Sequence, residues 1–211
     1  MAVEFHEIGT PREEEGGQVC ATNDGRVFIH QSGGKSEWTG SLFESILSGD
    51  LHLLVQLKDQ GIFDTAKAPD TGFSLLHYAA AAGQEEIASL LLKTMHRPHE
   101  PDWMQGSRPL AIACRYGWSS IVRKLIASGA IVPAVDRRGN TCMHEAARYA
   151  QYKCLSIVLE IITAERLAPM LCHVLWMKNL ESQTCYDVAV AEGHIDAADL
   201  IMSYMRRTIN H

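Results

Sequence analysis

The residues of this sequence that could do chemistry are mainly histidines and cysteines. The chain of 211 residues contains ten histidines and six cysteines. No two cysteines form a C-x-x-C pair, so their spacing favours neither a zinc site nor a small disulfide-linked domain. His96 and His99 flank a proline, but no third metal ligand lies near them in sequence. The pattern predicts no metal and no cofactor, and free thiols favour a reducing compartment, the cytoplasm or the nucleus.

Catalytic motifs are also missing from the sequence. Asp187 and His194 are close enough in sequence to suggest an acid–base pair, but no nucleophile sits in a supporting G-x-S-x-G motif. Gly34-Lys35-Ser36 is similar to the end of a P-loop, yet the glycine that a P-loop requires at position 29 is an isoleucine. We therefore expect a protein that is not an enzyme and has no small-molecule substrate.

The charge distribution points to binding instead. Residues 102–160 contain eight basic and four acidic residues, whereas the whole chain has a net charge of −6. The acidic total argues against general affinity for nucleic acid or anionic membranes, and no apolar run approaches the roughly 20 residues that span a bilayer. Within the basic section, the dipeptide Arg115-Tyr116 occurs again as Arg148-Tyr149. Arginine and tyrosine often dominate binding energy at protein interfaces.

The interval between these two dipeptides recurs along most of the chain. Gly49, Gly83 and Gly117 are evenly spaced, Ala150 continues the series, and Gly193 follows after a longer interval. Each of these positions lies between a short helical pattern rich in small residues and a longer amphipathic one. A repeat length of about 33 residues predicts a stacked solenoid, in which neighbouring units share one core.

The units resemble the ankyrin-repeat family. Residues 72–83 read GFSLLHYAAAAG and residues 139–150 read GNTCMHEAARYA, close to the family pattern G-x-T-P-L-H-x-A-A-x-x-G. The resemblance covers roughly residues 38–206. It implies an all-α solenoid of about five helix–turn–helix units, near residues 37–68, 69–101, 103–135, 136–178 and 179–206, with a tail at 207–211. His77 and His144 take the family's histidine position, where the imidazole bonds between neighbouring turns.

Three side chains are placed to cap first helices, and the segment 163–176 departs from the repeat pattern. Ser74, Thr141 and Thr184 each precede a first helix, where a hydroxyl can cap it. About ten extra residues fall in 163–176 and are apolar at helical spacing, which predicts a lengthened helix or a short additional one. This segment is either an insertion packed on the convex side or an added contact element.

Residues 1–36 form an extension outside the repeats. Residues 13–17 indicate a solvated flexible loop. Residues 19–30 carry an Asn23-Asp24-Gly25 turn between β-prone runs, which predicts a hairpin. We interpret the hairpin as a cap on the first repeat. The alternative is a strand offered to a partner.

The resemblance places partner binding on the loops between repeats and on the ends of the first helices, along the concave face. The candidate residues there are Trp103, Met104, Arg115, Tyr116, Arg137, Arg138, Arg148 and Tyr149. They predict a protein partner, an extended segment of acidic and apolar character. The alternative is a solvated surface whose arginines pair with Glu145 or Asp136. Replacing Arg115 and Arg148 by glutamate is expected to abolish capture without lowering the melting temperature.

The function expected from these features is a protein–protein interaction module: a scaffold, an adaptor or a regulatory subunit. The alternative is a substrate-recognition subunit of a ubiquitin-ligase or signalling complex. Few residues follow the fifth repeat, and they leave no room in this sequence for a C-terminal recruitment box. A third hypothesis is contact with nucleic acid through the basic middle repeats. The low lysine density and the acidic net charge count against it.

Overall fold

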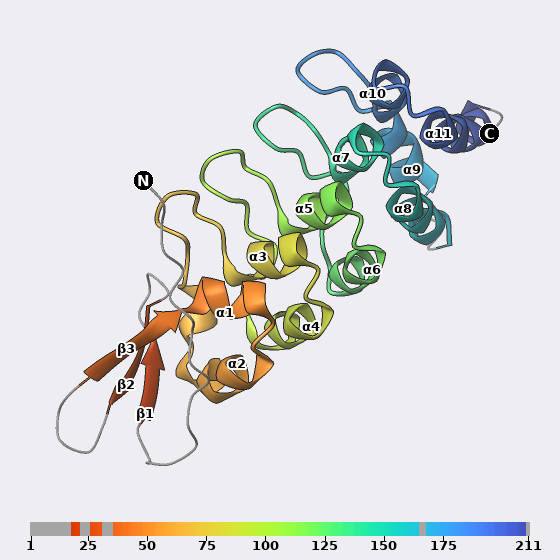
Figure 1. Cartoon of the computed structure of the whole chain (residues 1–211). Helices are drawn as coiled ribbons and strands as arrows, with labels where there is room; N and C mark the ends of the chain where they lie inside the picture. Colours follow the sequence, from red (N-terminus) through yellow and green to blue (C-terminus); the bar gives the residue numbers. More distant parts are fainter. Residues whose placement is uncertain (1–17, 22–25, 31–35, 165–167, 210–211) are drawn as a thin grey trace.

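The computed structural model describes residues 18–21, 26–30, 36–164 and 168–209. Helices stack in two rows along one axis (Figure 1). The inner row consists of α1 (Leu42–Ser48), α3 (Leu75–Ala82), α5 (Pro109–Tyr116), α7 (Cys142–Arg148) and α10 (Cys185–Ala191). The outer row consists of α2 (Leu51–Leu57), α4 (Glu85–Thr94), α6 (Ser119–Ala127), α8 (Tyr152–Ala164) and α11 (Ile195–Ile209). The predicted helical solenoid is confirmed.

One continuous core lies between the two rows. The inner helices contribute small buried residues such as Ala79 and Ala113, which let neighbouring units approach closely. The outer helices contribute larger aliphatic residues, such as Ile87 in α4 and Leu125 in α6. No single unit has enough apolar surface to form a core alone, so the repeats stabilise one another.

The helix starts follow the sequence expectation. The Thr141 and Thr184 hydroxyls accept hydrogen bonds from the backbone amides of the third helical residue. The Ser74 hydroxyl lies 2.8 Å from His77 Nδ1. His77 Nε2 lies 3.0 Å from the carbonyl oxygen of Ser107 in the next unit, and His144 Nε2 makes the same contact with Gln183. The histidine position therefore connects successive units, as the resemblance implies.

A second set of side chains connects the units at the opposite ends of the inner helices. The residue after each inter-helix turn donates to a carbonyl near the end of the previous inner helix. The pairs are Gln84 to Leu47 (3.4 Å), Trp118 to Ala81 (3.1 Å), Gln151 to Arg115 (3.2 Å) and His194 to Arg148 (3.0 Å). These bonds satisfy carbonyls that a helix leaves without partners at its C-terminus. Glutamine, tryptophan and histidine can all form this bond, because each side chain carries an N–H group at a similar distance from the backbone.

The N-terminal extension forms a three-stranded antiparallel sheet. Strands β1 (Gln18–Ala21), β2 (Arg26–His30) and β3 (Ser36–Ser41) are in the order β1-β2-β3. The predicted β1–β2 hairpin is present, but its 23–25 turn and the 13–17 loop lie outside the described residues. The third strand extends the sheet to Ser41, past the expected boundary at residue 36, because β3 pairs with the free edge of β2. The sheet contacts α1 and α2, in agreement with the cap interpretation.

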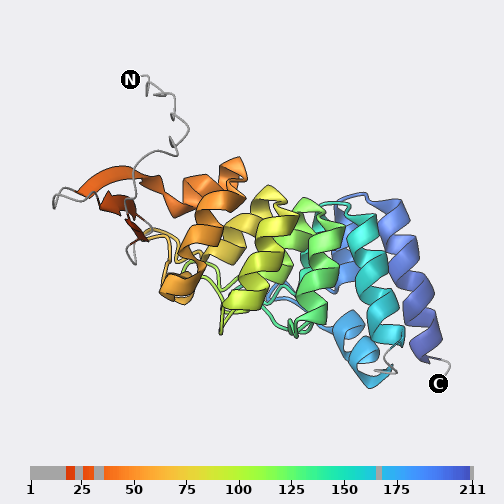
Figure 2. The same ribbon diagram turned by 90° about the horizontal axis from the view of Figure 1, so that it is seen from below.

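Two short 3-10 helices, η1 (Lys58–Gln60) and η2 (Ile62–Asp64), come after α2. The extra residues after the fourth inner helix both lengthen a helix and add one. Helix α8 has 13 residues, and α9 (Ala168–Trp176) is additional. Helix α9 contacts α8, α10 and α11 and lies beside the C-terminal end of α8 rather than in the outer row (Figure 2).

The last helix, α11, continues to Ile209, so residues 207–209 are helical rather than part of a tail. Met205 is buried, and the Arg207 guanidinium lies 4.9 Å from the Tyr204 ring, which extends packing to this last turn. Among the described helices, none is long and apolar enough to cross a membrane.

Candidate functional site

The loops before the inner helices all project to the same side of the solenoid (Figure 1). Three of them begin with a side chain that accepts backbone N–H groups of its own loop, namely Asp102, Asp136 and Asn179. Asp102 accepts from Gln105 and Ser107, at 2.6 and 2.9 Å. Asp136 Oδ1 accepts from the amides of Arg138 and Asn140, both at 2.8 Å. These bonds hold each loop in a tight turn, so its tip has a defined shape.

Backbone hydrogen bonds join the successive loop tips into a ladder. The Trp103 amide donates to Thr71 (3.1 Å), the Arg137 amide to Gln105 (2.8 Å) and the Leu180 amide to Arg138 (2.8 Å). Because each rung involves residues at the tips, the side chains of neighbouring loops lie next to one another. We call the exposed side of these tips and of the adjoining inner-helix ends the loop surface.

Trp103 packs against Gly72 of the preceding loop. A Cβ built on Gly72 would be only 2.3 Å from Cγ of Trp103, and Lys67 Nζ is 5.7 Å from the centre of the ring. The residue nevertheless remains 53% exposed. Trp103 is therefore held in place by its own chain while it presents a large aromatic face to solvent.

Gly72→Ala is expected to lower the free energy of unfolding by about 2 kcal/mol. The substitution forces a side chain into a left-handed backbone (φ +71°) and into the Trp103 ring. Gly61→Ala is the matched control, since Gly61 has φ +68° and no described atom within 4 Å of the added Cβ. It is expected to cost about 1 kcal/mol, the backbone contribution alone. Equal losses in urea unfolding would show that Trp103 is not seated on Gly72.

Arg115 is held by a carboxylate from the next repeat. Its Nε donates to Glu145 Oε2 at 2.8 Å, and the Glu145 side chain is only 5% exposed. The Arg115 guanidinium also lies 5.9 Å from the centre of the Tyr149 ring. Burial is the largest single influence on the pKa of Arg115 and acts to lower it, but the hydrogen bond and the charge of Glu145 together raise it. Arg115 therefore pairs with Glu145 within the chain, as the alternative of a solvated surface expects.

The two arginines of the 136–140 loop and Arg148 are differently placed. Arg137 and Arg138 are exposed, and neither has an ion-pair partner among the described residues. Arg148 Nη1 lies 3.6 Å from Glu192 Oε1, a pair in which both side chains are partly exposed. Asp136 is occupied by backbone amides and pairs with no described arginine side chain. These three arginines are therefore available to a partner.

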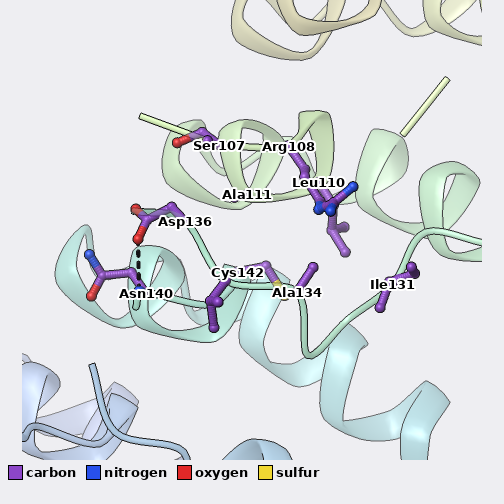
Figure 3. A pocket seen from close by; sticks show the side chains of 11 residues that line it. Ser107, Arg108, Leu110, Ala111, Ile131, Ala134, Asp136, Asn140 and Cys142 are labelled. Carbon is purple, nitrogen blue, oxygen red and sulfur yellow. Dashed lines mark hydrogen bonds between the residues drawn. The ribbon is translucent and has the colours of Figure 1, made fainter. Parts of the chain in front are cut away.

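A polar hollow of about 170 Å³ opens between the third and fourth repeats. Its lining residues come from two loops and two inner helices: Gln105, Arg115, Asp136, Arg138, Asn140, Glu145, Arg148 and Tyr149. Figure 3 shows a different cavity nearby, lined mainly by apolar residues of α5 and of the 131–142 segment. That cavity measures only about 10 Å³, so it has room for about one water molecule. The polar hollow is the larger recess on the loop surface.

The eight predicted residues fall into two groups. Arg115, Arg138, Arg148 and Tyr149 line the hollow together. Trp103, Met104, Tyr116 and Arg137 are exposed on the loop surface but do not line it. Gln105 and Asn140 occupy positions on the predicted binding face and also line the hollow, although they are not among the eight candidates. Glu145 and Asp136 were expected only as alternative partners of the arginines. Glu145 follows Arg115 by a little less than one repeat length, and that spacing was the available signal.

The residues considered for metal or acid–base chemistry have other partners. His96 Nδ1 lies 2.7 Å from Asp64, and His99 Nε2 lies 3.1 Å from the carbonyl of Ser128. Asp187 accepts from the Thr184 hydroxyl and amide, and His194 contacts the Arg148 carbonyl. In the described part of the chain, no three such side chains are grouped to hold a metal ion.

Comparison with known proteins decides the family. Residues 76–167 match the family model described as ankyrin repeats in three copies. This part of the chain consists of ankyrin repeats. The match begins in α3 and ends beyond α8, so it includes the two inner helices that line the hollow.

Several curated proteins are similar to part of this chain. The putative E3 ubiquitin-protein ligase XBAT31 of Arabidopsis thaliana is 34% identical over 139 residues, which are 63% of this chain and 28% of that protein. The glycerophosphocholine phosphodiesterase gde1 of Schizosaccharomyces pombe is 31% identical over 135 residues, 64% of this chain and 12% of that protein. The human SH3 and multiple ankyrin repeat domains protein 2 is 28% identical over 138 residues, 65% of this chain and 7% of that protein. The matched region is thus less than a third of each relative.

Ankyrin repeats mediate protein–protein interactions, through the extended surface that stacked units create. The ankyrin fold therefore agrees with the predicted class of function, a binding module.

Proposed function

We propose that this protein captures an extended segment of another protein along the loop surface, from Trp103 to Tyr149. The observation that carries the proposal is the combination of exposed aromatic residues with arginines that have no internal partner. Trp103, Tyr116 and Tyr149 are each about half exposed. Large side chains of these types give binding energy at little loss of conformational freedom.

The partner segment has acidic and apolar character. Arg137 and Arg138 are exposed at one loop tip, where guanidinium groups suit carboxylates. Trp103 and Met104 lie at the tip of the preceding loop and suit apolar side chains. The rung between Arg137 and Gln105 keeps the two tips adjacent, so one extended segment can contact both.

A peptide display selection tests this proposal. Random peptides of about twelve residues selected on the wild type are expected to be enriched in aspartate or glutamate next to apolar residues. The R137E/R138E variant is expected to lose the enriched peptides by at least about tenfold, since two attractive contacts become repulsive. Both side chains are exposed, so its melting temperature is expected to match that of the wild type.

R123E provides the control. Arg123 is an exposed arginine on the outer helix α6 that lies 3.8 Å from Glu160, away from the loop surface. The R123E substitution changes the charge by the same amount per residue as R137E/R138E does, and the R123E variant is expected to retain the peptides. Selection of peptides without acidic residues, or equal binding by R137E/R138E, would contradict the proposal.

A second candidate function is suggested by the relatives. XBAT31 of Arabidopsis thaliana and XBOS31 of rice, 34% identical over 123 residues, are both named E3 ubiquitin-protein ligases. A substrate-recognition role in such a complex would use the same loop surface. Copurification of ubiquitin-ligase components with the full chain, retained in R137E/R138E while the acidic partner is lost, would support this role.

We further propose that the chain acts by binding rather than by catalysis. The names of its relatives include ligases and a phosphodiesterase, but the matched residues are only 28% and 12% of XBAT31 and gde1. Cys114, Cys142, Cys154 and Cys185 are buried free thiols, which suits a protein of the cytoplasm or nucleus. Nucleic acid is a poorer partner, because two carboxylates lie in the hollow on the basic face.

A further inference from the structure

The hollow between the third and fourth repeats has a specific charge balance. Three arginines line it, Arg115, Arg138 and Arg148, together with the carboxylates of Asp136 and Glu145. Among the lining residues, three positive charges against two negative ones leave a single positive charge, and Glu192 contacts Arg148 from outside the lining at 3.6 Å. Gln105, Asn140 and Tyr149 add neutral polar groups to the wall. A site of this composition is suited to one negative charge.

The two carboxylates of the hollow are already occupied. Glu145 accepts from Arg115 Nε at 2.8 Å and is nearly fully buried. Asp136 Oδ1 accepts two backbone amides of its own loop, from Arg138 and Asn140. In the structure, neither carboxylate forms an ion pair with Arg138 or Arg148. Glu145 therefore acts as a positioning residue, since it fixes Arg115 at one wall of the hollow.

The remaining positive charge resides on Arg138 and Arg148. Arg138 has no ion-pair partner among the described residues. The contact of Arg148 with Glu192 is 3.6 Å long, and the Glu192 side chain is 44% exposed. A partly solvated pair of this length contributes little stability and exchanges readily. Arg148 can therefore leave Glu192 for a better acceptor without disturbing the fold.

We propose that this hollow binds one carboxylate side chain, an aspartate or glutamate of the partner segment, between Arg138 and Arg148. The inference rests on the proposed function and identifies its anchor point. A carboxylate carries one negative charge and matches the surplus of the lining. A phosphoryl group carries nearly two at neutral pH, and its additional charge would face Asp136 and Glu145.

The site can be probed without knowing the partner. N-acetyl-glutamate methylamide is titrated into the labelled full chain at low salt, and the amide and arginine Nε signals are followed by NMR. Saturable shifts are expected at Arg138 and Arg148. N-acetyl-glutamine methylamide, which has the same shape without the charge, is expected to produce none. N-acetyl-phosphoserine methylamide is expected to bind more weakly than the glutamate probe, and tighter binding of it would overturn the choice of a carboxylate.

Two variants with opposite expected effects on the affinity for the glutamate probe test the inference further. R148Q is expected to weaken the glutamate probe at least about fivefold, whereas E192Q is expected to strengthen it about twofold, because it releases Arg148. R123Q, which removes one charge from the outer row, is expected to leave the affinity unchanged. Identical binding by wild type, R148Q and E192Q would overturn the inference. If R137E/R138E still abolished peptide selection in that case, the proposed function would stand without this anchor.

Discussion

Replacing Arg115 by glutamate is expected to lower the free energy of unfolding by about 3 kcal/mol. Glu145 is nearly fully buried, and Arg115 Nε is its ion-pair partner, at 2.8 Å. The substitution removes that partner and places a second carboxylate next to the first. This result differs from the sequence-based expectation that the melting temperature would not change, because that expectation treated Arg115 as a free surface residue. Chemical denaturation at neutral pH measures the loss.

Arg148→Glu is the comparison for this experiment. Arg148 occupies the equivalent position one repeat later, but it meets a partly exposed glutamate at 3.6 Å instead of a buried one at 2.8 Å. Its cost in unfolding free energy is expected to be about 1 kcal/mol or less. Similar losses for the two variants would mean that burial of Glu145 does not distinguish them. The difference also identifies Arg148 as the better position for testing binding.

Acidification from pH 6.5 to 4 is expected to remove about 3 kcal/mol of stability through His77 alone. Burial lowers the pKa of His77 from 6.5 to about 4, with the hydrogen bond to Ser107 opposing it. Below pH 6.5 the unfolded chain binds a proton at this residue and the folded chain does not, so unfolding becomes more favourable. Burial lowers the pKa of His144 too, so it contributes in the same direction.

The variant that tests this effect is His77→Gln, followed by urea unfolding at several pH values from 7 to 4. The variant is expected to be less stable at pH 7 but to lose less on acidification than the wild type. Carboxylates with a lowered pKa, such as Glu100 hydrogen-bonded to Lys67, add their losses only at the acidic end of the range. An unchanged slope between pH 6.5 and 5 would show that His77 does not resist protonation in the folded state.

The parts of the fold that the sequence predicted are those set by local patterns. A hydroxyl before a helix and a histidine three residues later specify a cap and a bridge, as at Thr141 and His144. The strand β3 was not predicted, because residues 36–41 become a strand only by pairing with β2. The seat of Trp118 over Gly83 depends similarly on the distance between neighbouring repeats. The sequence pattern of a single repeat does not predict such contacts between repeats.

The candidate site was predictable in position but not in detail. The repeat period placed Arg115 and Arg148 side by side, and both line the hollow. Their different availability is decided by their acceptors, Glu145 and Glu192, whose burial depends on packing in three dimensions. Sequence spacing carries no information about burial of that kind.

The ladder of backbone hydrogen bonds between loop tips has a thermodynamic consequence. Loops that order only when a partner arrives subtract their lost conformational entropy from the binding free energy. Here Trp103, Arg137 and Leu180 are anchored through their own amides before any partner is present. Most of that ordering has therefore occurred during folding, so the proposed partner segment is expected to bind with a smaller loss of loop entropy. The same rigidity limits the range of segment shapes that this protein can accommodate.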